Sequence, residues 1–156
     1  MSRESFPGTN FLKIHYRADY SNDTKNVGLA RRGVTGFAGA CGFSEADIAD
    51  IRLAAGEALS NAVEHGSARS SGSFSVECGF DGDTLSIEVR DTGQGFVAPV
   101  RSDRAITPDQ RGRGFGIFLM RRLMDDVIFA GNGTAVRMLR RYPAQRRLVS
   151  QNGSRV

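Results

Sequence analysis

Glu57 and Asn61 lie one helical turn apart in the stretch GEALSNAVEH, so their side chains would project along one line of a helix. A carboxamide oxygen is a neutral ligand that suits Mg²⁺, and a carboxylate can accept a proton. This pair is therefore a candidate metal and base site. The alternative is that both side chains lie on the solvated face of the helix. His65 continues the same flank, although a histidine near a helix end is more often structural.

Asp91 follows the stretch LSIEV, in which the apolar residues alternate. The same period of two places Asp91 on the inward face, where a carboxylate is costly unless a hydrogen-bond donor satisfies it. Gly93 and Gly95 follow in DTGQG and would let the backbone approach a ligand closely. The other interpretation is an aspartate that ends a strand and opens a turn through its own side chain.

Two later stretches add weaker signals. Residues 112–116, GRGFG, alternate glycine with other residues directly before an apolar helix, and the N–H groups of a helix N-terminus suit a phosphate. The stretch lacks the ending of a P-loop and the preceding strand of a dinucleotide fingerprint, and a flexible loop end would look the same. Thr134 shares a face with Val136 and Met138, where an ordinary β-branched strand residue is the simpler interpretation.

The elements that must position these residues follow from hydrophobic periodicity. Ser44 is a predicted N-cap, with Asp47 at the third position of its helix. Residues 92–113 show no period, and ordered loops of this length are usually functional. We expect a strand over 11–17, helices over 22–41 and 44–66, a hairpin of strands 74–80 and 85–89, a helix over 114–125 and a closing hairpin around Asn132-Gly133. This order predicts an α+β fold, a two-layer α/β sandwich with helices on one face of a mostly antiparallel sheet.

Length and composition bound the class of protein. The 156 residues, 40% hydrophobic and 24% charged, are typical of one globular domain. The apolar runs are too short to span a membrane and the N-terminus lacks a secretory signal, so we expect a cytoplasmic protein. Cys41 and Cys78 match no metal spacing and are expected to be reduced. Residues 137–156 hold six Arg and no acid, which favours a solvated basic tail over 143–156 because no nucleic-acid-reading motif accompanies it.

Taken in order, E-x-x-x-N, D-x-G-x-G, G-x-G-x-G and a late Thr resemble the motifs of the GHKL (Bergerat-fold) ATP-binding family, over a domain of residues 10–142. The resemblance implies that Asp91 accepts a hydrogen bond from the adenine amino group with Thr134 supporting it. It also implies that Asn61 holds Mg²⁺ and that Glu57 is the catalytic residue at the γ-phosphate end. The further ATP-binding residues expected from it are His65, Gly93, Gly95, Phe96, Arg111, Gly112, Arg113, Gly114, Phe115 and Gly116.

Residues 96–111 would form the lid, and either Arg111 or Arg113 would contact the γ-phosphate. Two other branches of the family fit this sequence less well. Sensor histidine kinases need a helical hairpin with a phosphorylated His, and gyrase-like relatives carry transducer domains, and we expect neither feature here. The length and the stretches EALSNAVEHG and GRGFGIFLMRRLMDDV most resemble bacterial anti-sigma-factor serine kinases.

This closer resemblance implies a serine/threonine kinase that uses ATP and Mg²⁺ to phosphorylate a STAS-domain anti-anti-sigma factor. It also implies a homodimer that binds a sigma factor, without direct binding of nucleic acid or membrane. The alternative is a non-catalytic ATP-binding module that sequesters a partner protein, and the presence of Glu57 favours the kinase.

Overall fold

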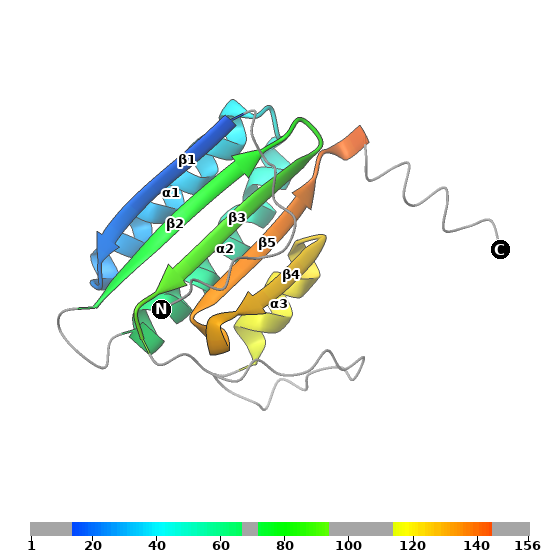
Figure 1. The fold of residues 1–156 in the computed structure, drawn as a ribbon. Coiled ribbons are helices and arrows are strands. Elements are labelled where there is room, and N and C mark those ends of the chain that lie inside the picture. The colour runs from blue at the N-terminus through cyan, green and yellow to red at the C-terminus, as the bar shows by residue number, and fades with distance from the viewer. Residues whose placement is uncertain (1–13, 67–71, 94–113, 145–156) are drawn as a thin grey trace.

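Five strands and three helices form two layers in a computed structural model that describes residues 14–66, 72–93 and 114–144 (Figure 1). The elements, in chain order, are β1 (Ile14–Ser21), α1 (Thr24–Ala40), α2 (Glu45–Gly66), β2 (Ser73–Phe80), β3 (Thr84–Asp91), α3 (Phe115–Leu123), β4 (Asp126–Ala130), the 3₁₀ turn η1 (Gly131–Gly133) and β5 (Ala135–Arg141). None of the helices in this part of the chain has the length and apolarity that crossing a bilayer requires.

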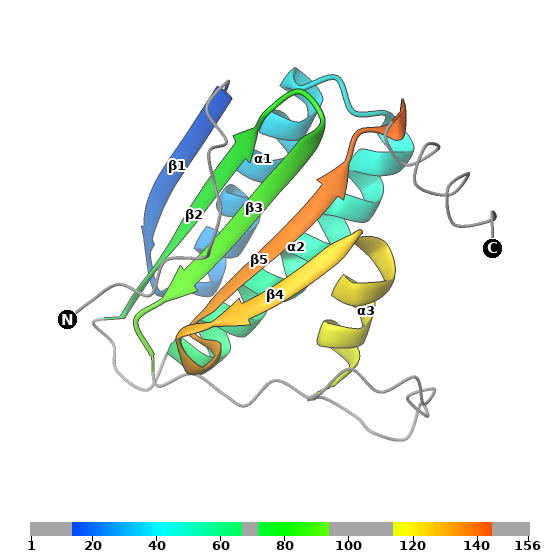
Figure 2. The ribbon, with the colours of Figure 1, turned by 45° about the vertical axis from the view of Figure 1, so that its right-hand side comes forward.

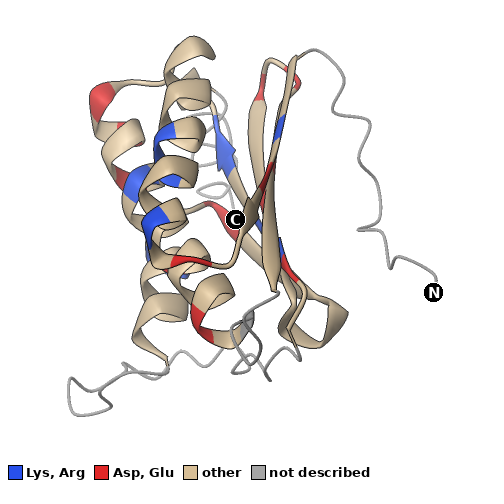
Figure 3. Cartoon of the chain, turned by 90° about the vertical axis from the view of Figure 1, so that its left-hand side faces the viewer, with Lys and Arg blue, Asp and Glu red and all other residues tan. Residues whose placement is uncertain are grey.

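The strands form one sheet in the order β1-β2-β3-β5-β4, and every neighbouring pair is antiparallel. All three helices cover the same face of this sheet (Figure 2), and an edge-on view separates the helical layer from the sheet (Figure 3). The predicted α+β sandwich is therefore confirmed. Cys41 and Cys78 are both free thiols, as expected.

The core lies between α2 and the middle strands. Every apolar residue that the helical period of α2 places inward is buried, and so are the alternating apolar residues of β2 and β3. These residues are Ile48, Ile51, Ala55, Ala58, Leu59, Ala62 and Val63 of α2, Phe74, Val76, Cys78 and Phe80 of β2, and Leu85, Ile87 and Val89 of β3. Burial of each large side chain contributes roughly 1.5–3 kcal/mol, so this stripe fixes where α2 lies on the sheet.

Several predicted boundaries are wrong: α1 runs over Thr24–Ala40 and not 22–41, β3 runs over Thr84–Asp91 and not 85–89, and the first strand and third helix also differ. The first strand was expected over 11–17, but β1 runs to Ser21 because the inward alternation continues through Ala18 and Tyr20, which pair with Val76 and Phe74. Polar residues between them on the outer face hide this continuation in the sequence. Residues 11–13 lie outside the described part of the chain. The third helix ends at Leu123 and not at 125, since the chain is extended from Met124 onward.

A buried ion-pair cluster joins α2, α3 and β5. Arg140 of β5, only 8% exposed, donates to Asp47 at 2.6 Å and to Asp50 at 2.9 Å, and also to the carbonyl of Leu123 at the end of α3. Asp47 in turn accepts a hydrogen bond from the hydroxyl of Ser44, the predicted N-cap, whose oxygen accepts from the Asp47 N–H. The guanidinium thereby satisfies polar groups on two helices, α2 and α3, and ties both to β5.

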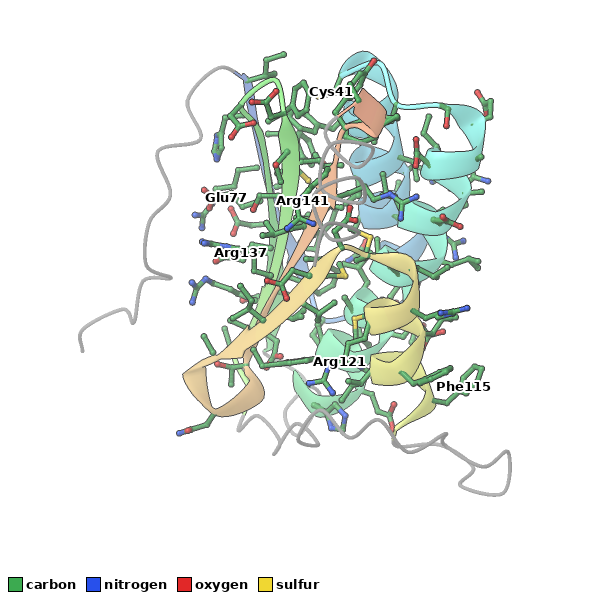
Figure 4. The ribbon with its side chains drawn as sticks, turned by 90° about the vertical axis from the view of Figure 1, so that its right-hand side faces the viewer. Cys41, Glu77, Phe115, Arg121, Arg137 and Arg141 are labelled. Atoms are coloured by element: carbon green, nitrogen blue, oxygen red, sulfur yellow. The ribbon has the colours of Figure 1, made fainter. Side chains whose placement is uncertain are left out.

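The outer face of the sheet, which the helices leave uncovered, carries paired charges. Glu88 is 8% exposed because Arg90 and Arg137 lie on either side of it and both bind its carboxylate. Glu77 pairs with His15 and Arg17 of β1. In Figure 4, Glu77 and Arg137 both lie on the side of the sheet away from the helices.

Candidate functional site

A pocket opens between the second half of α2, the end of β3 and the β4–β5 hairpin. Its free space is about 250 Å³ including the open mouth. The residues that line it are Ala58, Asn61, Ala62, Val89, Asp91, Phe129, Gly133, Thr134 and Val136. Three residues predicted from separate motifs, Asn61, Asp91 and Thr134, meet in it.

Asp91 is half-buried at the end of β3, in the inward phase expected of it. Its Oδ1 accepts the N–H of Gly93 at 2.7 Å, and its own N–H donates to the carbonyl of Thr134 at 2.9 Å. The turn interpretation is therefore correct as well, since one carboxylate oxygen opens the turn. Burial raises the pKa of Asp91 above its usual value, while the Gly93 hydrogen bond and the charge of His65 oppose this shift. A ligand N–H would relieve the cost of burying the charged form.

Thr134 lies just before β5 and not inside it, so the interpretation as an ordinary strand residue is wrong. Its hydroxyl donates to the carbonyl of Gly131 at 2.8 Å, which leaves the oxygen to accept a hydrogen bond from a ligand. Gly131 has φ +60°, and a Cβ there would lie 2.5 Å from that hydroxyl oxygen. Asn132 and Gly133 also have positive φ, which confirms the predicted hairpin turn.

Glu57 and Asn61 are both half-buried, so the alternative that they lie on the solvated face is wrong. Asn61 lines the pocket. Glu57 lies one turn away, with its Oε2 only 2.6 Å from the position that a Cβ on Gly116 would occupy. Neither side chain makes a hydrogen bond or ion pair with another residue in the described ranges. Together with Asp91 they form a polar line from the pocket to the first turn of α3.

The N-terminus of α3 is the other end of this line. Gly114 is the N-cap and supplies no side chain to cap the helix, so among the described residues the first N–H groups of α3 have no side-chain cap. The side chain of Phe115 is 55% exposed, and the centroid of its ring lies 6.3 Å from that of Phe118. Phosphate binding by Gly114, Phe115 and Gly116 stays a prediction.

Several predicted residues cannot be placed. Gly95, Phe96, Arg111, Gly112 and Arg113 lie outside the described residues, as do the expected lid over 96–111 and the tail from 145 onward. His65 is in the last turn of α2, close enough for its charge to affect Asp91, and its role in ATP binding stays a prediction.

The sequence interpretation missed the apolar walls of the pocket, above all Phe129. The alternation of Val127 and Phe129 in β4 is the signal that could have found this residue, because it places both on the inward face. In the part of the chain that the structure describes, no three carboxylate, histidine or cysteine side chains gather as a metal site.

Comparisons with known proteins identify the family of this chain. Residues 20–140 match the histidine kinase-like ATPase domain family. The chain is 31% identical over 143 residues to the serine-protein kinase RsbW of Oceanobacillus iheyensis, and the match covers 86% of each protein. It is 36% identical over 110 residues to RsbW of Bacillus licheniformis, covering 65% of this chain and 68% of the relative.

A solved structure shares the fold. The RsbU and RsbW domains of Rv1364c from Mycobacterium tuberculosis match with a TM-score of 0.55 over 83% of this chain, at 16% identity. This chain spans 32% of that longer one, and at 16% identity the likeness bears on the fold alone. From the family match and the relative matched over 86% of each protein, the chain belongs to the histidine kinase-like ATPase domain family, in the group of serine-protein kinases named RsbW.

Proposed function

We propose that this protein is an ATP-dependent serine kinase that phosphorylates a STAS-domain anti-anti-sigma factor and also binds a sigma factor. The observation that carries the proposal is the convergence of Asn61, Asp91 and Thr134 on one pocket, with Glu57 one turn away against the start of α3. The naming of the relatives as serine-protein kinases supports the reaction type. We further propose that it acts as a homodimer in the cytoplasm, without direct binding of nucleic acid or membrane.

Adenine recognition is assigned to the pocket. The exocyclic amine would donate to the carboxylate of Asp91, whose Oδ1 is already held by Gly93, and the hydroxyl oxygen of Thr134 would support it by accepting. The ring would lie between apolar walls that include Val89 and Phe129. The polyphosphate would then extend past Asn61 toward the N–H groups in the first turn of α3.

The residues present fit a magnesium ion bound chiefly through the nucleotide. Mg²⁺ usually takes one or two oxygens from the protein and the rest from phosphates and water. The carboxamide of Asn61 lines the pocket next to the path of the polyphosphate and offers one such oxygen. When bound, the ion would neutralise charge on the transferring phosphoryl group.

Transfer needs a base beside the acceptor hydroxyl, and we assign this role to Glu57. The serine oxygen of the acceptor protein bonds to the γ-phosphorus while the bond to the β–γ bridging oxygen breaks, so that ADP leaves. The hydroxyl proton passes to the Glu57 carboxylate. Arg111 or Arg113 would stabilise charge on the phosphoryl group, and Glu57 lies where a hydroxyl approaching the N-terminus of α3 would meet it.

Radioactive transfer is the direct test. The protein is mixed with [γ-³²P]ATP and candidate STAS-domain proteins from the same genome, and phosphorylated acceptor is detected on a gel. Label on a serine of one acceptor supports the kinase. Tight binding of a sigma factor with no transfer to any acceptor would favour the non-catalytic module instead, and sedimentation of the same samples tests the homodimer.

A further inference from the structure

Helix α3 presents one of its two adjacent arginines to the wall of the pocket. Arg121 lies one turn after the buried Ile117 and is itself half-buried, whereas Arg122 is exposed. The Arg121 guanidinium lies over the ring of Phe129, 5.9 Å from its centroid. Phe129 is part of the pocket lining. In Figure 4, Arg121 lies between α3 and the β4–β5 hairpin.

The direction of the Arg121 side chain brings its charge toward the proposed path of the polyphosphate. Side chains on a helix tilt toward its N-terminus, so a guanidinium at this position reaches back toward the first turn of α3. That turn is where Gly116 meets the carboxylate of Glu57. The guanidinium of Arg121 therefore lies at the Phe129 wall of the pocket, on a helix whose first turn meets Glu57.

An anionic ligand such as a polyphosphate would need a cationic side chain near the pocket. Among the residues described as lining it, Asp91 is the only ionisable one, and its carboxylate repels an anionic ligand. Guanidinium groups bind phosphate through paired N–H donors, and an aromatic ring holds their plane in a fixed orientation.

We propose that Arg121 is a further ligand-binding residue that contacts the polyphosphate of the bound nucleotide, with Phe129 orienting its guanidinium. This inference rests on the proposed function, because it assumes that the pocket binds the base of ATP. The simpler explanation is that Arg121 and Arg122 both stabilise the C-terminal end of α3 through their charge. Arg122 shares that position and residue type, so it is a matched control.

The test is calorimetric titration of ATP and of adenosine into the wild type, Arg121→Gln and Arg122→Gln. Hydrogen bonds to charged groups contribute about 1.5–3 kcal/mol, so Arg121→Gln should weaken ATP binding by about tenfold or more. Adenosine has no phosphate, and its affinity should stay within about twofold, as should both affinities in Arg122→Gln. Increasing salt should weaken ATP binding less in Arg121→Gln than in the wild type.

Equal ATP affinities of the two glutamine variants would overturn the inference. An equal loss of ATP and adenosine in Arg121→Gln would overturn it too, because Arg121 would then only support the Phe129 wall. If thermal unfolding shows that Arg121→Gln is unfolded, Arg121→Lys takes its place. Lysine keeps the positive charge but lacks the paired N–H donors of a guanidinium. We again expect ATP affinity to fall and adenosine affinity to stay unchanged. A wild type that binds neither ligand would instead refute the proposed function itself.

Discussion

The two ends of helix α2 both carry a pair of polar side chains, but they use them in opposite ways. Near its start, Asp47 and Asp50 both accept hydrogen bonds from the buried Arg140 of β5. Near its end, Glu57 and Asn61 lie beside the pocket and make no hydrogen bond to another described residue. Hydrogen bonds within the protein satisfy the first pair, whereas the second remains available to a ligand.

This difference separates a structural anchor, the cluster of Asp47, Asp50 and Arg140, from the candidate site at Glu57 and Asn61. In the sequence the two pairs look alike, since both lie along one line of the same helix. The first pair becomes structural because a guanidinium from a distant strand neutralises it. The second stays available because the nearest element, the first turn of α3, presents glycine instead of a charged partner. Polar groups that the fold leaves unsatisfied next to a pocket are expected at functional sites.

Removing the carboxylate of Glu57 should have the largest effect, which is on the rate of phosphoryl transfer. Glu57→Ala should slow phosphoryl transfer by about 10²–10⁴-fold, the usual span for loss of a general acid–base group. ATP affinity should change little, because Glu57 lies outside the pocket lining. Transfer is measured with labelled ATP and affinity by calorimetry. Loss of both together would make Glu57 structural, and transfer at the full rate would remove it from the mechanism.

Gly116 offers a matched control for the position of Glu57. A Cβ at Gly116 would displace the flexible end of the Glu57 side chain, so Gly116→Ala should keep the fold and the backbone N–H but slow transfer. In a Glu57→Ala background the same change should have no further effect, because the group it displaces is gone. Additive losses in the double variant would show that Gly116 acts independently of Glu57.

Breaking the anchor should affect stability instead of chemistry. Arg140→Met removes the guanidinium that pairs with the buried Asp47 carboxylate, which should lower the free energy of unfolding by about 3–5 kcal/mol. Its neighbour Arg141 is the control. That side chain is 41% exposed and 3.9 Å from Asp125, so Arg141→Met should lower stability by at most about 1 kcal/mol. Both values come from urea unfolding, and equal losses would contradict the distinction between anchor and site.

Patterns within one element predicted much of this molecule. The helical period of α2 identified its buried stripe, and the period of two placed Asp91 inward at the end of β3. The turn around Asn132 was predictable because three successive residues with positive φ need glycine or asparagine. In each case the physical cause lies within a few residues along the chain.

Contacts between distant segments were not predictable in the same way. Arg140 and Asp47 are 93 residues apart, and nothing near either residue indicates the other. The approach of Glu57 to Gly116 depends on how α3 packs on α2, and the Phe129 wall depends on β4 lying beside β5. The family resemblance, and not local periodicity, indicated that the polar motifs form one site.

A smaller change should sharpen the assignment of the pocket. Asp91→Asn replaces part of the acceptor facing the adenine amine with a donor, and loss of a charge-assisted hydrogen bond corresponds to about 1.5–3 kcal/mol. ATP and adenosine affinities should therefore both fall, which calorimetry measures. Asp19→Asn on the outer face of the sheet is the control and should leave both unchanged. Unchanged ATP affinity in a folded Asp91→Asn variant would refute the base-binding role.

The smallest expected effect is a pH dependence that Asp91 should impart to adenosine binding. Burial holds the pKa of this carboxyl above its usual value, so lowering the pH protonates it earlier than an exposed aspartate. The protonated form presents a hydroxyl to the adenine amine, and adenosine affinity should fall as the pH approaches this pKa from neutrality. Titrations from pH 7 downward should show this decline in the wild type and not in Asp91→Asn.

The stability of the ligand-free protein should change with pH in the direction opposite to adenosine affinity. An acid whose pKa is raised on folding binds more protons in the folded state, so its contribution to stability decreases as the pH rises from the unfolded pKa through the folded one. At pH 7 the ionised Asp91 therefore opposes folding, and Asp91→Asn should unfold at the same or a higher urea concentration than the wild type. If Asp91→Asn binds adenosine less tightly but is no less stable than the wild type, the role of Asp91 is to bind the ligand. A less stable variant would instead place Asp91, like Asp47, among the anchoring residues.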